Sequence, residues 1–146
     1  MDEAWDEPFD APVKCLLKWY HLNENKHYLT KVHTVASISN KQKRRHGLEE
    51  LLEKSDMYQI RFILRAVSDV YKGYYSIEEE QVEKIRKSDS ASFLSEHLLL
   101  PETTQALFNK DKETLSNAVL ECADVLKPVL TVFFQEWQSG SETEDV

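Results

Sequence analysis

The stretch "EKSDMYQIRFILRAVSDVYKGYYSIEEE" (Glu53–Glu80) decides the fold of this chain. Its apolar residues recur at steps of three and four, which is the period of one face of an α-helix. They are Met57, Ile60, Ile63, Leu64, Val67, Val70, Tyr71 and Tyr74. Ser55 or Asp56 can cap the amino end of such a helix, and Gly73 suits the left-handed residue that follows one. We therefore predict a core helix over 56–73.

The opposite face of this predicted helix is polar. It carries Arg61, Arg65, Ser68, Asp69 and Lys72. Because Arg65 and Asp69 are four residues apart, we expect them to form a surface ion pair worth a few tenths of a kcal/mol. Ser76, with Glu79 three residues later, has the pattern of a capping box and predicts a second helix over 76–87.

The rest of the chain has the same character. Further helical patterns cover 11–22, 26–39, 48–54, 93–98 and the long stretch from Lys112 to Gln138. Three glycines and four prolines argue against a turn-rich β architecture. Pro128 predicts a kink or a short break in the last stretch, because proline lacks an amide donor. We predict an all-α, single compact bundle of about five to seven helices with a long kinked C-terminal helix.

Charge divides the 146 residues into a domain and two acidic ends. Residues 1–10 and 139–146 are acidic and have no helical period, so we expect them to be disordered on either side of a helical domain at 11–138. The net charge is −8, yet no acidic residue occurs between Asn25 and Leu48. This basic window can attract an anionic partner, whereas the overall negative charge disfavours nonspecific binding of nucleic acid.

The sequence contains no recognisable catalytic or metal-binding pattern. Three separate glycines cannot build a phosphate-binding loop. A zinc site needs clustered thiols and imidazoles, but Cys15 and Cys122 are far apart in the sequence. The glutamates at 49–53 and 78–80 are expected to occupy early helical turns, where negative charge complements the helix dipole. We therefore predict no catalytic residue, no cofactor and no metal, and expect a protein that is not an enzyme.

The apolar segments indicate where the protein resides. No apolar run approaches the roughly twenty residues that span a bilayer, so membrane insertion is not expected. Cys15 and Cys122 each lie inside an apolar helical pattern, which is typical of buried, reduced thiols in an intracellular protein. We expect a cytoplasmic or nuclear location, or both.

The amino-terminal segment "DEAWDEPFDAP" combines acidic residues with Trp5 and Phe9. A large aromatic side chain on a solvated tail either folds back on the domain or anchors in a pocket of a partner. The segment resembles the acidic aromatic peptides, of DPF or WxxF type, that clathrin-adaptor appendages bind. Glu7 stands where the first pattern has aspartate, and Trp5 and Phe9 are four apart where the second has three. Activation segments and docking onto the chain's own basic window are equally open, and Trp5 and Phe9 are our candidate partner-binding residues.

The run "SNKQKRRHG" (Ser39–Gly47) supplies a candidate basic patch, Lys41, Lys43, Arg44 and Arg45. We expect a polar loop, or the frayed start of the following helix. Three functions fit such a run: a solvated loop, a nuclear-import signal, or a phosphate-binding patch for nucleic acid. Residues 40–47 contain no aromatic side chain that could stack on a base, which weakens the nucleic-acid interpretation.

The carboxyl-terminal "SGSETEDV" offers two candidate phosphorylation sites. Ser139 and Ser141 are each followed three residues later by a glutamate, the pattern of acid-directed phosphorylation. The terminal valine also suits a carboxylate-binding groove, although an untethered solubilising tail is the simpler interpretation.

Together these patterns favour a protein-binding adaptor or a subunit of a multiprotein complex. The helical body and the acidic aromatic segment would present its binding surfaces. The alternative is a nuclear, nucleic-acid-associated factor that uses the basic segment 41–46.

Overall fold

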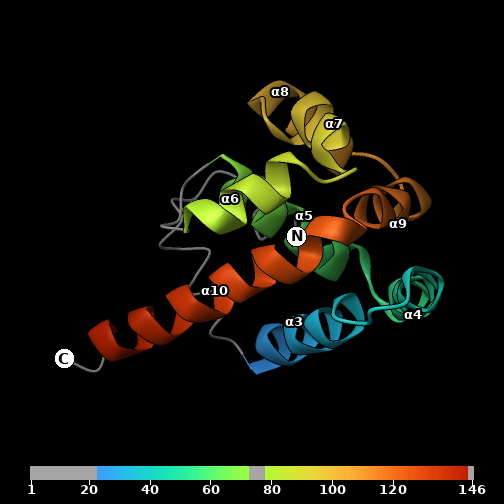
Figure 1. Cartoon of the computed structure of the whole chain (residues 1–146). Coiled ribbons are helices and arrows are strands. Elements are labelled where there is room, and N and C mark those ends of the chain that lie inside the picture. Colours follow the sequence, from blue (N-terminus) through green and yellow to red (C-terminus); the bar gives the residue numbers. More distant parts are fainter. Residues whose placement is uncertain (1–22, 73–77, 145–146) are drawn as a thin grey trace.

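The computed structural model describes residues 23–72 and 78–144, and every regular element in that part of the chain is helical (Figure 1). The elements are α3 (Asn23–Ala36), α4 (Lys41–Lys54), α5 (Met57–Tyr71), α6 (Glu79–Arg86), α7 (Ala91–Phe93), the π-helical turn η1 (Leu94–Leu98), α8 (Pro101–Phe108), α9 (Lys112–Glu121) and α10 (Ala123–Glu144). The all-α prediction is confirmed. The described residues contain eight α-helices, more than the five to seven expected.

Helix α5 forms the centre of the bundle, and α3, α9, α10 and η1 all pack against it. Its start is fixed by a capping box: the Asp56 side chain accepts from the Gln59 amide at 2.8 Å, and the Gln59 side chain accepts from the Asp56 amide at 3.0 Å. The predicted apolar face is confirmed, because Ile60, Ile63 and Leu64 are fully buried. A local sequence pattern therefore placed the core helix correctly.

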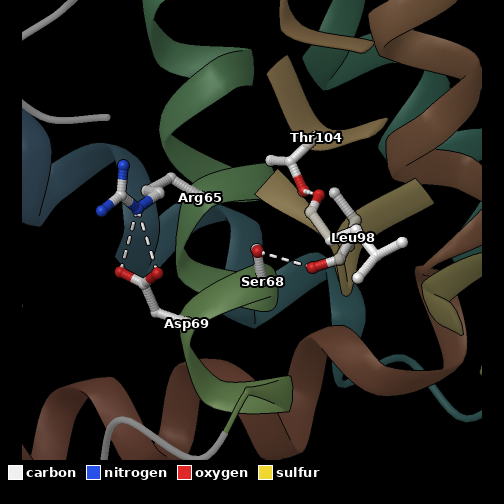
Figure 2. A network of polar contacts seen from close by, with 6 residues as sticks. Arg65, Ser68, Asp69, Leu98 and Thr104 are labelled. Atoms are coloured by element: carbon white, nitrogen blue, oxygen red, sulfur yellow. Dashed lines mark hydrogen bonds and ion pairs between the residues drawn. The ribbon is translucent and has the colours of Figure 1, made fainter. Parts of the chain in front are cut away.

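Arg65 and Asp69 on the opposite face of α5 form the predicted ion pair, but the prediction that it lies on the surface is wrong. Arg65, Ser68 and Asp69 are buried rather than exposed, and Asp69 retains only 1% of its accessible surface. The Arg65 Nε lies 3.0 and 3.1 Å from the two Asp69 carboxylate oxygens, and the Ser68 hydroxyl donates to the Leu98 carbonyl of η1 at 2.8 Å (Figure 2). Helices pack on α5 from more than one side, so these three polar side chains are enclosed and have partners inside the protein.

The break in the last helical stretch lies at Cys122, six residues before Pro128, so the prediction of a break at Pro128 is wrong. Pro128 instead lies inside the continuous helix α10. Helix α9 packs against α4 and α5, whereas α10 packs against α3, α5 and α6. The chain changes direction where its packing partners change. Cys122 is buried at this junction, as its apolar context predicted.

Other boundaries also differ from the sequence predictions. Helix α6 begins at Glu79 rather than at residue 76, and Ser76 lies outside the described residues. The short helix expected near 93–98 is present, but everything after Phe93 in it, Leu94–Leu98, has π-helical geometry. Pro101 then starts α8, where its missing amide costs nothing because the first turn has no acceptor for it.

The ends of the chain are described only in part. Helix α10 continues to Glu144, so helical backbone covers 139–144 of the segment expected to be disordered. The predicted tail at 1–10 and the predicted helix at 11–22 lie outside the described residues. Among the helices at 23–72 and 78–144, none is both long and apolar enough to cross a membrane.

Candidate functional site

The basic patch lies on the first two turns of α4, so of the two predicted alternatives the segment is the start of the following helix and not a loop. Asn40 caps this helix, because its side-chain oxygen accepts from the Lys43 amide at 2.9 Å. Leu48 and Leu52 are buried and hold the carboxyl-terminal half of α4 on the core. The polar composition predicted correctly that this segment is exposed. It did not predict its helical backbone.

Positive charge at the start of α4 is unfavourable. The helix dipole places a partial positive charge at the amino end, and the first turn of α4 contains no acidic residue to offset the basic side chains. The glutamates at 49–53 lie in the middle and last turns, so the prediction that they occupy an early turn is wrong for this group. It holds for Glu79 and Glu80, which start α6. Helix α4 therefore breaks a local rule that α6 obeys.

Acidic residues from other parts of the fold compensate this charge. Arg44 is the most buried of the four, with 16% of its side chain exposed. Its two terminal nitrogens donate to the Ile38 carbonyl at 3.0 Å and to the Asp124 carboxylate at 3.2 Å. Arg44 therefore ties the turn between α3 and α4 to the first turn of α10, and it is a structural residue rather than a free cation.

The other three basic side chains are exposed. Lys41 lies 3.5 Å from the Asp89 carboxylate and Arg45 lies 3.8 Å from that of Glu49. Ion pairs with this exposure contribute about 0–1 kcal/mol and exchange readily with an incoming ligand. Lys43 forms no ion pair with the described residues.

Two neighbouring hollows lie beside this end of α4, and their linings share Arg44, Ala123 and Asp124. Together we call them the α4–α10 groove. The first hollow, of about 330 Å³, is bounded by α4, by the turn before α7 and by the junction of α9 and α10. Its charged lining residues are Lys41, Arg44, Arg45, Asp89, Glu121 and Asp124. Bases and acids are equal in number, so this half of the groove is electrically mixed.

The second hollow, of about 370 Å³, lies between α3, α4, α6 and α10. Its charged lining residues are Arg44, Lys84, Lys127 and Asp124, so cations outnumber acids. Because Arg44 and Asp124 pair with each other, Lys84 and Lys127 supply the excess positive charge. Ala36, Ala123 and Pro128 supply apolar surface beside them.

Thr131 lines the second hollow, and His33 of α3 lies next to it. The Thr131 hydroxyl donates to the Lys127 carbonyl at 2.8 Å, and the His33 Nε2 lies 3.2 Å from the same hydroxyl oxygen. Burial, and secondly the positive charge of Lys127, lower the pKa of His33.

No protein-family model, curated protein or solved structure matches this chain. The site must therefore be interpreted from its own chemistry. Within the described residues, no three histidine, cysteine or acidic side chains lie together in a way that could hold a metal ion. Burial raises the pKa of the Cys122 thiol, which keeps it protonated and a poor nucleophile.

The other predicted site residues cannot be placed beside the groove. Trp5 and Phe9 lie outside the described residues, and Ser139 and Ser141 lie on α10 where side chains are not described. Sequence reasoning missed Lys84 and Lys127. Each is an ordinary exposed lysine within a helical pattern, and no local signal connects either to α4.

Proposed function

We propose that this chain is a non-enzymatic protein-binding adaptor or complex subunit, and that the α4–α10 groove is its principal binding surface on the folded body. The observation that carries the proposal is the placement of basic side chains at the start of α4 against the helix dipole, beside a groove. Positions that break a local rule are frequent at functional sites. A mixed lining of acids, bases and small apolar residues suits a polypeptide ligand.

The contacts of Arg44 and the net charge favour protein over nucleic acid. Arg44 is held by the Ile38 carbonyl and the Asp124 carboxylate, so one of the four cations of the patch is not free to contact a phosphate. Nucleic-acid affinity depends on cations that can neutralise many phosphates at once, and the net charge of −8 opposes that. The nuclear, nucleic-acid-associated alternative therefore ranks second.

The acidic aromatic segment is the second element of the proposal and rests on sequence alone. Trp5 and Phe9 would fill two pockets of a partner, with Pro8 keeping the peptide between them extended. Replacing both aromatic residues by alanine should leave the melting temperature unchanged and remove at least one captured partner. A lower melting temperature with every partner retained would assign them to the chain's own core.

Uncharged steric blocks test the groove itself. Gln42 lines the first hollow and Gln81 the second, so Gln42→Trp with Gln81→Trp should obstruct both without altering charge. The matched control is Gln105→Trp, which is exposed on α8 and lines neither hollow. Affinity capture from lysate should lose at least one protein with the double variant and none with the control. An unchanged set of captured proteins, or tight nucleic-acid binding with a steep salt dependence, would overturn the proposal.

A further inference from the structure

We infer that the second hollow of the α4–α10 groove binds an acidic peptide segment, whose carboxylates contact Lys84 and Lys127. This inference rests on the proposed function and names the chemical class of the partner. The protein as a whole is acidic, with a net charge of −8, so a hollow where cations exceed acids stands out from its surroundings. Complementary charge gives such a site selectivity and a fast encounter with an acidic ligand.

The two lysines are available to a ligand. Lys84 lies 4.0 Å from the Glu80 carboxylate, and both side chains are mostly exposed, so the pair is weak. Lys127 is exposed and forms no ion pair with the described residues. Arg44, by contrast, already donates to Ile38 and Asp124 and is held in the wall.

The lining distinguishes a peptide from a nucleic acid. None of the described residues that line the second hollow is aromatic, and its one guanidinium, that of Arg44, is already bound to Ile38 and Asp124, so the lining offers no aromatic platform on which a base could stack. The adjoining hollow contributes Asp89 and Glu121, which would repel a polyanion that continued along the groove. A peptide needs only a short cationic stretch, and its aliphatic side chains can contact Ala36, Ala123 and Pro128.

The direct test is fluorescence anisotropy with a defined probe. The probe is a fluorescein-labelled peptide of sequence Glu-Glu-Leu-Glu-Glu-Leu-Glu-Glu, and its neutral counterpart carries glutamine in place of every glutamate. We expect saturable binding of the acidic peptide to the whole chain, much weaker binding of the neutral peptide, and loss of affinity with added salt. Lys84→Glu with Lys127→Glu should weaken binding about tenfold or more.

A charge-matched control separates the site from the overall charge. Lys31→Glu with Lys110→Glu changes the net charge equally at two exposed lysines that line neither hollow. This control should retain affinity within about twofold. Equal weakening by the two pairs, or no binding of the acidic peptide, would overturn the inference. A single-stranded oligonucleotide that binds more tightly than the peptide through the same two lysines would also overturn it.

His33 provides a readout at the site. Because the charge of Lys127 contributes to the lowered pKa of His33, a carboxylate bound beside Lys127 should raise that pKa, measured by NMR titration of the ring. An unchanged pKa at saturating peptide would place the peptide elsewhere. If the tryptophan block abolishes partner capture while the lysine reversals do not, the groove remains a protein-binding site and only the acidic class of ligand is wrong.

Discussion

Two ion pairs of the same spacing occupy opposite environments in this protein. Arg65–Asp69 on α5 and Arg45–Glu49 on α4 are both separated by four residues. In the first the nitrogen–oxygen distance is 3.0 Å and the side chains are 10% and 1% exposed. In the second the distance is 3.8 Å and the side chains are 60% and 50% exposed. Helical spacing predicts that such residues form an ion pair, whereas burial decides how much the pair contributes to the free energy of unfolding.

The largest effect is expected from breaking the buried pair. Asp69→Ala leaves the Arg65 charge in the interior without its carboxylate, so the free energy of unfolding should fall by about 3–5 kcal/mol. Urea denaturation followed by circular dichroism measures this. Replacing both partners at once, as Arg65→Met with Asp69→Leu, should recover much of the loss, because a buried pair can be exchanged for apolar residues of similar volume. Similar urea midpoints for Asp69→Ala and wild type would show that the pair is solvated.

The apolar face of the same helix gives the next comparison. Leu64 is fully buried in the centre of α5, so Leu64→Ala should cost about 2–5 kcal/mol through lost burial and the cavity left behind. Arg61→Ala should cost less, about 1 kcal/mol, because this half-buried side chain contributes a hydrogen bond from Nε to the Phe108 carbonyl at 2.9 Å. Equal denaturant midpoints for the two variants would mean that the two faces of α5 carry equal weight.

Replacing Ser68 tests whether its buried hydrogen bond to Leu98 stabilises the contact between α5 and η1. Ser68→Ala removes the donor to the Leu98 carbonyl of η1, so we expect a loss of about 1–3 kcal/mol from the unsatisfied oxygen. Hydrogen exchange should quicken at the amides of η1. Ser92→Ala, at an exposed position on α7, is the control and should change neither stability nor exchange. Unchanged hydrogen exchange in η1 would show that the Ser68 hydrogen bond does not stabilise η1.

The half-buried side chain of His33 makes the stability of the protein depend on pH. Because the folded protein lowers the pKa of His33 below its usual 6.5, the unfolded chain binds more protons below that pH. The contribution of this residue to stability is therefore complete at neutral pH and is lost as the pH falls below about 6.5. Melting temperatures from pH 5 to 8 should show a shallower dependence in His33→Gln. The same pH dependence of the melting temperature in the variant and in wild type would show that titration of His33 does not affect stability.

The smallest effect is expected from the exposed pair. A double-mutant cycle with Arg45→Ala and Glu49→Ala should give a coupling energy of about 0–1 kcal/mol, and salt should reduce it. The same cycle on Arg65 and Asp69 should give a larger coupling that salt barely changes. Equal salt dependence of the two coupling energies would show that burial does not shield the Arg65–Asp69 pair from salt.

The residues of the α4–α10 groove could be predicted from the sequence only in part. In the sequence Lys41, Lys43, Arg44 and Arg45 form one basic patch, but in the folded protein they have separate roles. Arg44 pairs with Asp124, eighty residues further along the chain. A test that reverses Arg44 and Arg45 together would therefore disturb the fold as well as the surface, and exposed lysines are better probes. Lys84 and Lys127 join the site only because α6 packs on α10.

The sequence by itself determined the helical class, the core stripe of α5 and the apolar context of Cys122, because these follow from periodicity within one segment. Only the tertiary structure decided that Arg65 and Asp69 are buried, that the helical stretch breaks at Cys122 rather than at Pro128, and that Arg44 contacts Asp124. A helix has the same local pattern whether one or several neighbours cover it. Burial, breaks and distant ion pairs depend on which helices pack together, and that is a property of the whole chain.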